Sequence, residues 1–379
     1  MFVCAHCFED AELANYIKGL SIDEACSFCS DATVGAAYIE DVASHIRSCL
    51  YQDYDDAVNQ LYWDSDERVY QGCHWDTYEL LFDHLGLYLP RDKGDRLMSA
   101  ILDHIGYNFW CETNPYGPSD QEVAIFSWNR FCNIVMHHRR FFFLNVESES
   151  YGHEVHGPAK VLKNIFDYAR EIGLFKTLPS GTQLYRARWD DTETLQKTAR
   201  DLGPPPQEKA TQSNRMSPPG IVMFYACDEI ETALLETASG PGRFAVARFE
   251  TRRPATILDL TSIPSVPSLF GPPTGILEFR PRKPIMFLRH LAEHISRPIK
   301  RDQRVHVDYV PTQVVTEFIR SQTHDDQAQV DGIKYDSSVH SGHSSYVLFA
   351  SQDNMRSPKS NLAKVDQWLE LVGMCHCSV

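Results

Sequence analysis

Four cysteines near the N-terminus have the spacing of a metal-binding site. Two CxxC pairs lie 18 residues apart and contain Cys4, Cys7, Cys26 and Cys29. Four thiolates can surround Zn²⁺ tetrahedrally, and the two-residue gap lets a tight turn present each pair of sulfur atoms. Four unligated thiols are a less favourable alternative, because exposed thiols oxidise. We therefore predict a structural zinc site in a segment spanning residues 1–30.

An arginine in the second half of the chain could bind a phosphate group. Arg186 stands in the motif LYRAR, on a predicted strand, and Arg188 shares its face through the two-residue alternation of strands. The planar guanidinium donates two parallel hydrogen bonds and therefore suits a pyrophosphate. A surface arginine in a salt bridge is the alternative interpretation.

A tyrosine and a glutamate follow within one predicted strand–helix unit. Tyr225 ends the strand pattern IVMFYA, and Glu236 lies in the helix pattern DEIETALLETA. Asp228 is the expected N-cap of this helix, with Glu231 completing a capping box, and Ile230 is expected on its buried face. The strand-end aromatic ring and the helix carboxylate can then face one cleft. A core tyrosine and a solvated glutamate are the alternatives.

A turn rich in hydroxyl groups and histidine lies near the end of the second half. The sequence DSSVHSGHSS, residues 336–345, separates two predicted strands and suits ligand contacts from a loop. A solvated loop without a ligand is the alternative. The preceding segment VHVDYVPTQVVTEFIR predicts a strand followed by a helix.

The elements that must position these residues form an α+β protein. Residues 31–174 show the three- and four-residue apolar spacing of helices, and the last of these meets Gly173, an expected C-cap. Short strand patterns, separated by turn-rich segments and helices, then fill residues 175–352. Residues 353–379 predict one last helix and a short tail that contains Cys375, His376 and Cys377.

The composition excludes two classes of function. The 379 residues include 51 acidic and 36 basic ones, a net charge of −15, which argues against non-specific nucleic-acid binding. No apolar run is long enough to span a bilayer, so no membrane partner is expected, and the N-terminus lacks the features of a signal peptide. A cytoplasmic location is therefore expected.

Several motifs occur in an order that resembles the RES family of NAD-degrading domains. They are YRAR, RMSPPGIVMFY followed by ETALLE, DYVPTQ, and DGIKYDSS followed by YVLF. The resemblance implies an ADP-ribosyltransferase-like mixed α/β fold in residues 175–352. It also implies cleavage of the nicotinamide–ribose bond of NAD, an activity of toxins in toxin–antitoxin pairs.

Matching the motifs position by position implies five site residues: Arg186, Arg215, Tyr225, Glu236 and Ser337. The two arginines are expected to hold the pyrophosphate of NAD, and Tyr225 to offer its ring to the cationic nicotinamide. Glu236 is expected to stabilise the positive charge that develops on the ribose, and Ser337 to hydrogen-bond the ribose or the amide. Arg186, Tyr225 and Glu236 are the expected catalytic residues. The chain departs from the family pattern at Met216, Ser217 and Asp336.

The helical region resembles HEPN domains, which precede some RES domains. Arg130 and His137 have the R-x4–6-H spacing of HEPN ribonucleases. The basic sequence HHRR that includes His137 is equally explained as a helix end, where cations interact favourably with the helix dipole. This region is expected to sense, gate or bind a partner.

The favoured function is an NAD glycohydrolase or phosphorylase that acts as a toxin or defence effector. An ADP-ribosyltransferase that modifies a macromolecule is one alternative, and a non-catalytic, zinc-containing NAD sensor is another. A HEPN ribonuclease is a third. The expected partners are NAD, an antitoxin or immunity protein and, in a homo-oligomer, a second copy of the chain.

Overall fold

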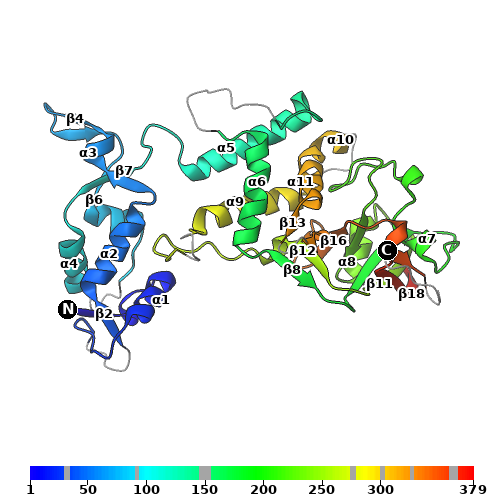
Figure 1. Ribbon diagram of the computed structural model, residues 1–379, viewed down its shortest axis with the longest axis horizontal. Helices are drawn as coiled ribbons and strands as arrows, with labels where there is room; N and C mark the ends of the chain where they lie inside the picture. The colour runs from blue at the N-terminus through cyan, green and yellow to red at the C-terminus, as the bar shows by residue number, and fades with distance from the viewer. Residues whose placement is uncertain are drawn as a thin grey trace. The chain divides into compact units, whose positions relative to one another are not determined.

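The structure is a computed structural model that describes residues 1–29, 35–89, 94–144, 155–273, 279–298, 304–324, 328–357 and 366–379. The chain divides into two units (Figure 1). The first contains residues 1–123 and 265–286. The second contains the described residues of 124–264 and 287–379.

The first unit is built mainly from helices. Asp10 caps helix α1 (Ala11–Leu20) by accepting a hydrogen bond from the Leu13 amide at 2.9 Å. Leu13 and Ile17, one turn apart on this helix, are fully buried. The helices are α1 (Ala11–Leu20), α2 (Ile39–Leu50), α3 (Ala57–Gln60), the π-helix η2 (Glu79–His84), α4 (Gly94–Ile105) and the 3-10 helix η1 (Ala5–Cys7). The predicted helical region with its cysteine cluster is thus confirmed.

Short strands complete the first unit. They are β1 (Phe2–Cys4), β2 (Ala36–Tyr38), β3 (Tyr54–Asp56), β4 (Tyr62–Asp64), β5 (Val69–Gln71), β6 (Trp75–Asp76) and β7 (Phe109–Glu112). β1 pairs with β2, β4 pairs with β5, and β7 lies between β3 and β6. The pairing of β1 with β2 fixes the position of Cys4, the last residue of β1.

The second unit is organised around a mixed nine-stranded sheet in the order β17-β18-β11-β9-β10-β16-β15-β12-β8. The pairs β12–β15 and β17–β18 are parallel, and the other pairs are antiparallel. The strands are β8 (Phe175–Leu178), β9 (Gln183–Trp189), β10 (Phe224–Cys227), β11 (Arg243–Thr251), β12 (Ala255–Asp259), β15 (Gly332–Asp336), β16 (Ser344–Leu348), β17 (Met355–Arg356) and β18 (Leu369–Ser378). The mixed α+β class predicted from the sequence is confirmed.

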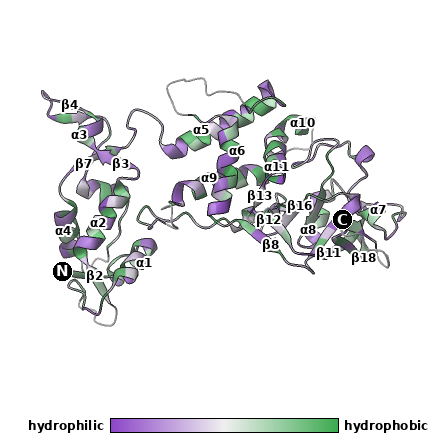
Figure 2. Ribbon diagram, viewed as in Figure 1, coloured by the Kyte–Doolittle hydropathy of each residue, from purple (hydrophilic) through white to green (hydrophobic). Residues whose placement is uncertain are grey.

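Helices bury their apolar side chains against one face of this sheet, where Ile333 and Val347 contribute to a shared core. They are α5 (Asp120–Asn133) with the π-helix η3 (Ile134–His138), α6 (Pro158–Glu171), α9 (Arg282–Ser296) and α11 (Val310–Ser321). Hydrophobic and hydrophilic residues both occur along α6 and α9, as amphipathic helices require (Figure 2). The smaller elements are α7 (Ala199–Leu202), η4 (Gln207–Lys209), α8 (Ile230–Thr237), η5 (Leu260–Ser262), α10 (Val305–Asp308), β13 (Thr323–His324), β14 (Ala328–Gln329) and η6 (Gln352–Asn354).

Helix α6 ends as its sequence predicts. Gly173 has a φ of +75°, and its amide donates to the carbonyl of Arg170 at 2.9 Å. The amide of Leu174 donates to the carbonyl of Ala169 at 2.8 Å. These two bonds form a Schellman motif, in which a glycine adopts the left-handed conformation without steric cost. Gly173 thus ends the helix as predicted, one residue beyond the C-cap, which is Ile172.

Two predicted elements are wrong. The C-terminal helix predicted in residues 353–379 is instead the strand β18, which pairs with β11 along Arg243–Thr251, while residues 358–365 lie outside the described part. Leu369 and Leu371 are buried on alternate positions, so the long-range ladder overrides the local helix preference of this segment. The strand predicted before Val310 is the short helix α10.

Candidate functional site

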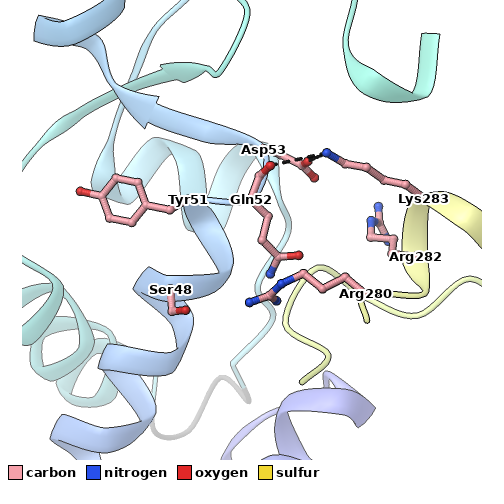
Figure 3. A pocket seen from close by; sticks show the side chains of 7 residues that line it. All are labelled: Ser48, Tyr51, Gln52, Asp53, Arg280, Arg282 and Lys283. Atoms are coloured by element: carbon pink, nitrogen blue, oxygen red, sulfur yellow. Dashed lines mark hydrogen bonds and ion pairs between the residues drawn. The ribbon is translucent and has the colours of Figure 1, made fainter. Parts of the chain in front are cut away.

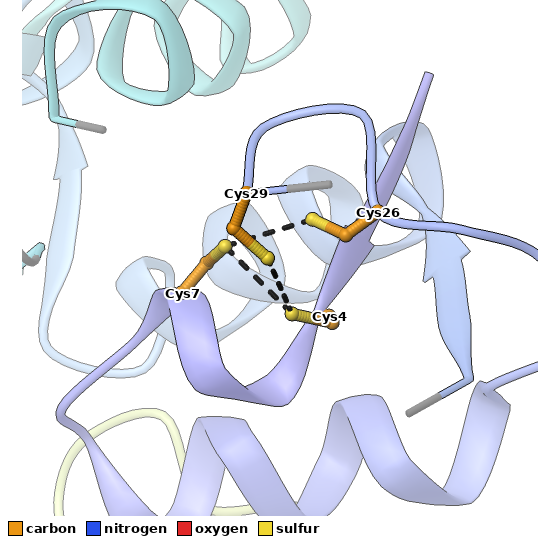
Figure 4. A group of neighbouring side chains, drawn as sticks. All are labelled: Cys4, Cys7, Cys26 and Cys29. Atoms are coloured by element: carbon orange, nitrogen blue, oxygen red, sulfur yellow. Dashed lines mark hydrogen bonds between the residues drawn. The ribbon is translucent and has the colours of Figure 1, made fainter. Parts of the chain in front are cut away.

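The four cysteines of the N-terminal motif meet in one cluster (Figure 4). The Sγ atom of Cys4 lies 3.8 Å from that of Cys7 and 3.4 Å from that of Cys29, and Cys7 lies 3.6 Å from Cys26. Zinc–sulfur bonds of about 2.3 Å in a tetrahedron put the sulfur atoms about 3.8 Å apart. The cluster therefore has the dimensions of a four-thiolate metal site.

The electrostatics of the cluster call for a cation. Burial and the neighbouring thiols raise the pKa of Cys4 to about 11 and raise the pKa of Cys7 well above its usual value. Burial acts in the same direction on Cys26, but backbone amides including that of Phe28 outweigh it and lower the pKa of Cys26 to about 7. All eleven cysteines are free of disulfides. A bound divalent cation would stabilise the four thiolates and remove their mutual repulsion.

A cavity of about 360 Å³ in the first unit is lined by basic side chains (Figure 3). Lys283 forms ion pairs with Asp53 and Asp120 at 2.5 and 2.8 Å. Arg280 and Gln52 both contact the Cys49 thiol, where they oppose the effect of burial, which raises the pKa of Cys49 to about 11. The cationic groups of Lys283 and Arg280 thus have partners within the unit.

In the second unit, Arg186 joins two strands that hardly pair. The register between β9 and β10 consists of Cys227 opposite Tyr185. Beyond that pair, Arg186 Nη1 donates to the carbonyl of Tyr225 at 2.8 Å, and its guanidinium lies 5.7 Å from the centre of the Phe224 ring. The side chain therefore bridges the sheet where the backbone ladder between β9 and β10 ends.

Arg186 is a desolvated cation. Burial, and then the charge of Arg188, lower the pKa of Arg186 to about 10, and its buried Nε has no acceptor. Arg188 donates to the backbone carbonyl of Asp201. Among the residues that the structure describes, neither arginine forms a salt bridge. The alternative of a salt-bridged surface arginine is therefore wrong for Arg186.

Tyr225 lies on the other face of the sheet from Arg186. Its neighbour two residues on, Cys227, packs with Ala187 and with Ala233 of α8, so α8 covers this face. The Tyr225 hydroxyl contacts the Ser217 hydroxyl at 2.9 Å and accepts a hydrogen bond from the Met216 amide at 3.3 Å. Burial raises the pKa of Tyr225 to about 12, which keeps the phenol protonated.

Arg215 is held by carbonyl groups near the end of α9. Its Nη1 donates to the carbonyls of Ile295 and Arg297, the latter at 2.8 Å, and its Nη2 lies 3.5 Å from the Ser338 hydroxyl. The guanidinium also lies 5.7 Å from the centre of the Tyr309 ring. These contacts bring Arg215 beside the loop that contains Ser337 and Ser338.

Glu236 and Ser337 form the most direct contact among the predicted site residues. Ser337 Oγ donates to Glu236 Oε1 at 2.7 Å, and Ser345 Oγ donates to the same oxygen at 3.1 Å. The amides of Val339 and His340 donate to Ser337 Oγ at 3.4 and 3.2 Å. Because these amides occupy the lone pairs of the hydroxyl, its proton is directed at the carboxylate.

Comparison with known families assigns both halves of the chain. Residues 21–149 match the model of HEPN/RES N-terminal domain 1, and residues 183–368 match the model of the RES domain. This chain joins a HEPN/RES N-terminal domain to a RES domain. RES domains are a family of NAD-degrading toxin domains. Searches of the curated proteins and of the solved structures gave no match.

The RES domain thus brings its predicted residues together in two groups. Glu236 and Ser337 are hydrogen-bonded, and Arg215 contacts Ser338, the neighbour of Ser337. Arg186 belongs to the opposite face of the sheet and reaches Tyr225 only through the backbone carbonyl of the tyrosine.

In the described part of the chain, no helix is both long and apolar enough to cross a bilayer.

Helix α8 of the RES domain begins differently from the prediction. Its N-cap is Glu229 and no side chain caps it, because the Asp228 carboxylate accepts a hydrogen bond from the Ser344 amide at 2.9 Å. Ile230 is exposed rather than buried, and Thr232 and Ala233 are the buried residues of the helix. The capping box that we predicted from Asp228 and Glu231 is therefore wrong.

Two further residues adjoin the predicted site residues without having been assigned a role from the sequence. Ser345 is the last residue of the turn that we expected to contact a ligand; it stands on β16 and contacts Glu236. Tyr335 stands on β15, where burial raises its pKa well above the usual value and the negative charge of Glu236 adds to the shift. Both residues belong to strand patterns that were recognised, but only the pairing of β15 with β16 brings them opposite each other, at Tyr335 and Ser345.

Proposed function

We propose that the RES domain of this chain cleaves the nicotinamide–ribose bond of NAD, with Glu236 as the essential carboxylate. The observation that carries the proposal is the hydrogen bond of 2.7 Å from Ser337 to Glu236, together with the second bond from Ser345. Two hydroxyl donors hold one oxygen of the carboxylate in a fixed direction. A preorganised negative charge of this kind stabilises a cation that develops beside it.

In the reaction, the bond between ribose C1′ and the nicotinamide nitrogen breaks, and both electrons leave with nicotinamide. The ribose acquires oxocarbenium character, as in glycoside hydrolysis. We assign to Glu236 the stabilisation of this charge and to Ser337 a hydrogen bond to the nicotinamide ribose or amide. An oxygen of water or phosphate then forms the new bond to C1′ and loses a proton to the solvent.

Two arginines support an anionic substrate. Within the described part of the chain, the guanidinium groups of Arg186 and Arg215 are held by carbonyls and pair with no carboxylate, so we assign both to the pyrophosphate of NAD, Arg186 at the point where the ladder between β9 and β10 ends. Tyr225 is assigned to the nicotinamide ring, on the face of β10 that α8 covers. The register between β9 and β10, reduced to the pair Cys227–Tyr185, is compatible with the split sheet of an ADP-ribosyltransferase-like fold.

The metal assignment belongs to the same proposal. Cys4, Cys7, Cys26 and Cys29 would hold a Zn²⁺ ion that stabilises the fold of the N-terminal segment. Since four cysteines complete the coordination shell, this ion would take no part in the cleavage of NAD.

The test is release of nicotinamide from NAD by the purified full-length protein, with and without phosphate. Glu236→Gln keeps the size of the side chain and removes its charge, so we expect the rate to fall about 100-fold or more. Glu317→Gln, the same substitution at an exposed position of α11, is the control and should be as fast as the wild type. A wild type that releases no nicotinamide, or a Glu236→Gln variant of wild-type rate, would contradict the proposal.

The product identifies the acceptor. Free ADP-ribose indicates hydrolysis, and a phosphorylated ADP-ribose formed only with phosphate indicates phosphorolysis. Labelled NAD that marks a macromolecule indicates the ADP-ribosyltransferase, and NAD binding without turnover indicates the sensor; either result would overturn the assignment.

RES domains are typically components of toxins, and we propose that this chain is one. Induced expression should then lower cellular NAD and arrest growth, and Glu236→Gln should relieve both effects. An antitoxin or immunity protein is the partner that this role requires. Growth arrest that persists in the Glu236→Gln variant would contradict the toxin mechanism.

A further inference from the structure

A group of acidic and imidazole side chains lies beside the Glu236–Ser337 pair. Glu229, the N-cap of α8, faces two histidines of the loop between β15 and β16. Glu229 Oε1 lies 3.2 Å from Nδ1 of His340 and 3.2 Å from Nδ1 of His343. The two imidazole rings are stacked, with their centres 4.1 Å apart.

These distances match the coordination shell of a metal ion. The three ligand atoms all lie within 4.8 Å of one another. Zinc ligands about 2.0–2.2 Å from the ion are separated by about 3.0–3.5 Å in octahedral or tetrahedral geometry. The two separations of 3.2 Å therefore fall in the range for ligands of one ion, and the stacked imidazole rings would rotate out of their stack to direct both Nδ1 lone pairs at it.

The ligand types select the class of ion. Two imidazole nitrogens and one carboxylate oxygen suit zinc and related transition metals, whereas magnesium and calcium prefer oxygen alone. The three side chains are partly exposed, so that an ion can enter from solvent.

We propose that Glu229, His340 and His343 bind a Zn²⁺ ion. Thr232 is the buried neighbour that competes for His340, since its hydroxyl lies 2.8 Å from Nδ1. The same hydroxyl also lies 3.1 Å from Glu229 Oε1. When His340 gives its lone pair to the ion, Thr232 therefore keeps a hydrogen-bond acceptor, and the buried hydroxyl is not left unsatisfied.

The ion would connect the start of α8 to the loop that carries Ser337. The His340 amide already donates to Ser337 Oγ, and the Ser337 amide donates to the carbonyl of His343 at 2.9 Å. Fixing both histidines therefore fixes the serine that contacts Glu236. This consequence for catalysis rests on the proposed function, whereas binding of the ion does not.

Zinc titration of the full-length protein tests the site without any activity measurement. The double variant His340→Gln/His343→Gln keeps the four cysteines, so we expect the wild type to bind one equivalent more zinc than this variant. Glu229→Gln, which retains both histidines, should weaken the extra site by at least about 10-fold. His306→Gln, an exposed histidine on α10, is the control and should bind as the wild type does.

Circular dichroism and melting curves verify that the variants are folded. If the double histidine variant is unfolded, Glu229→Gln alone tests the metal site. Equal zinc stoichiometry and affinity in the wild type and in Glu229→Gln would overturn the proposal. Because the readout is binding, an inactive wild type that still binds the extra zinc would refute the proposed NAD cleavage and leave the metal site standing.

Discussion

Ser337 and Glu236 are joined by a hydrogen bond of 2.7 Å in which the serine hydroxyl is the donor. Two backbone amides direct that hydroxyl at the carboxylate. The bond links the loop after β15 to α8, two segments about one hundred residues apart in the chain. The serine is therefore a positioning residue for the carboxylate, in addition to the contact with NAD that we propose for it.

Replacing the serine should slow nicotinamide release. In Ser337→Ala the Glu236 carboxylate loses a donor, and hydrogen bonds to charged groups contribute about 1.5–3 kcal/mol, which corresponds to roughly 10–100-fold in rate. Steady-state assays against Ser321→Ala, an exposed serine at the end of α11, provide the comparison. A Ser337→Ala rate within about twofold of the control would show that the bond contributes nothing to turnover.

Arg186→Lys should weaken the binding of NAD. Lysine keeps a positive charge, but it lacks the planar fork that can bond the Tyr225 carbonyl and a phosphate oxygen together. We expect KM for NAD to rise about 10-fold, with a smaller change in kcat. Arg200→Lys, an exposed position, should leave both constants unchanged. An unaltered KM in Arg186→Lys would remove this arginine from the NAD site.

The four-cysteine cluster should hold zinc in the purified protein. Cys7→Ser removes one ligand from a site that lies in the same core as Leu13 and Ile17. We expect this variant to contain one equivalent of zinc less than Cys73→Ser, whose cysteine is exposed and outside the cluster. The melting temperature should fall as well, because metal binding contributes to folding. Equal zinc contents, measured by elemental analysis, would show that the cluster is a group of free thiols.

Local patterns predicted the elements that depend only on local chemistry. The end of α6 requires a residue with a positive φ, and the glycine at position 173 predicts this conformation from the sequence alone. The CxxC spacing identified the four cysteines because each pair forms its own turn. Arg186 and Arg188 could be placed on one face of β9 because strand alternation is a property of the strand itself, and β11 pairs with both residues in that register.

Tertiary partners decided what the sequence could not show. Asp228 looks like an N-cap, but the Ser344 amide, more than one hundred residues away, takes its carboxylate. Likewise, residues 369–378 form the strand β18 because they hydrogen-bond with β11 along its whole length. The contacts of Ser345 and of the two histidines with α8 arise from the same long-range packing, so no spacing in the sequence could reveal them.

Alkaline pH should lower the free energy of unfolding of the second unit, and ionisation of the buried Cys132 thiol is one cause that a single substitution can test. Burial raises the pKa of Cys132 to about 12, whereas a thiol in the unfolded chain has a pKa near 9.0. Between these values the folded state keeps the proton and the unfolded state loses it, so the free energy of unfolding falls as pH rises. One such group contributes up to about 1.4 kcal/mol per pH unit. The free energy of unfolding is measured with urea under reducing conditions. Its decline between pH 9 and 10 should be smaller in Cys132→Ala than in the wild type by about 1 kcal/mol, because the cavity left by the substitution costs the same at both pH values. A decline as steep as that of the wild type would show that this thiol titrates alike in both states.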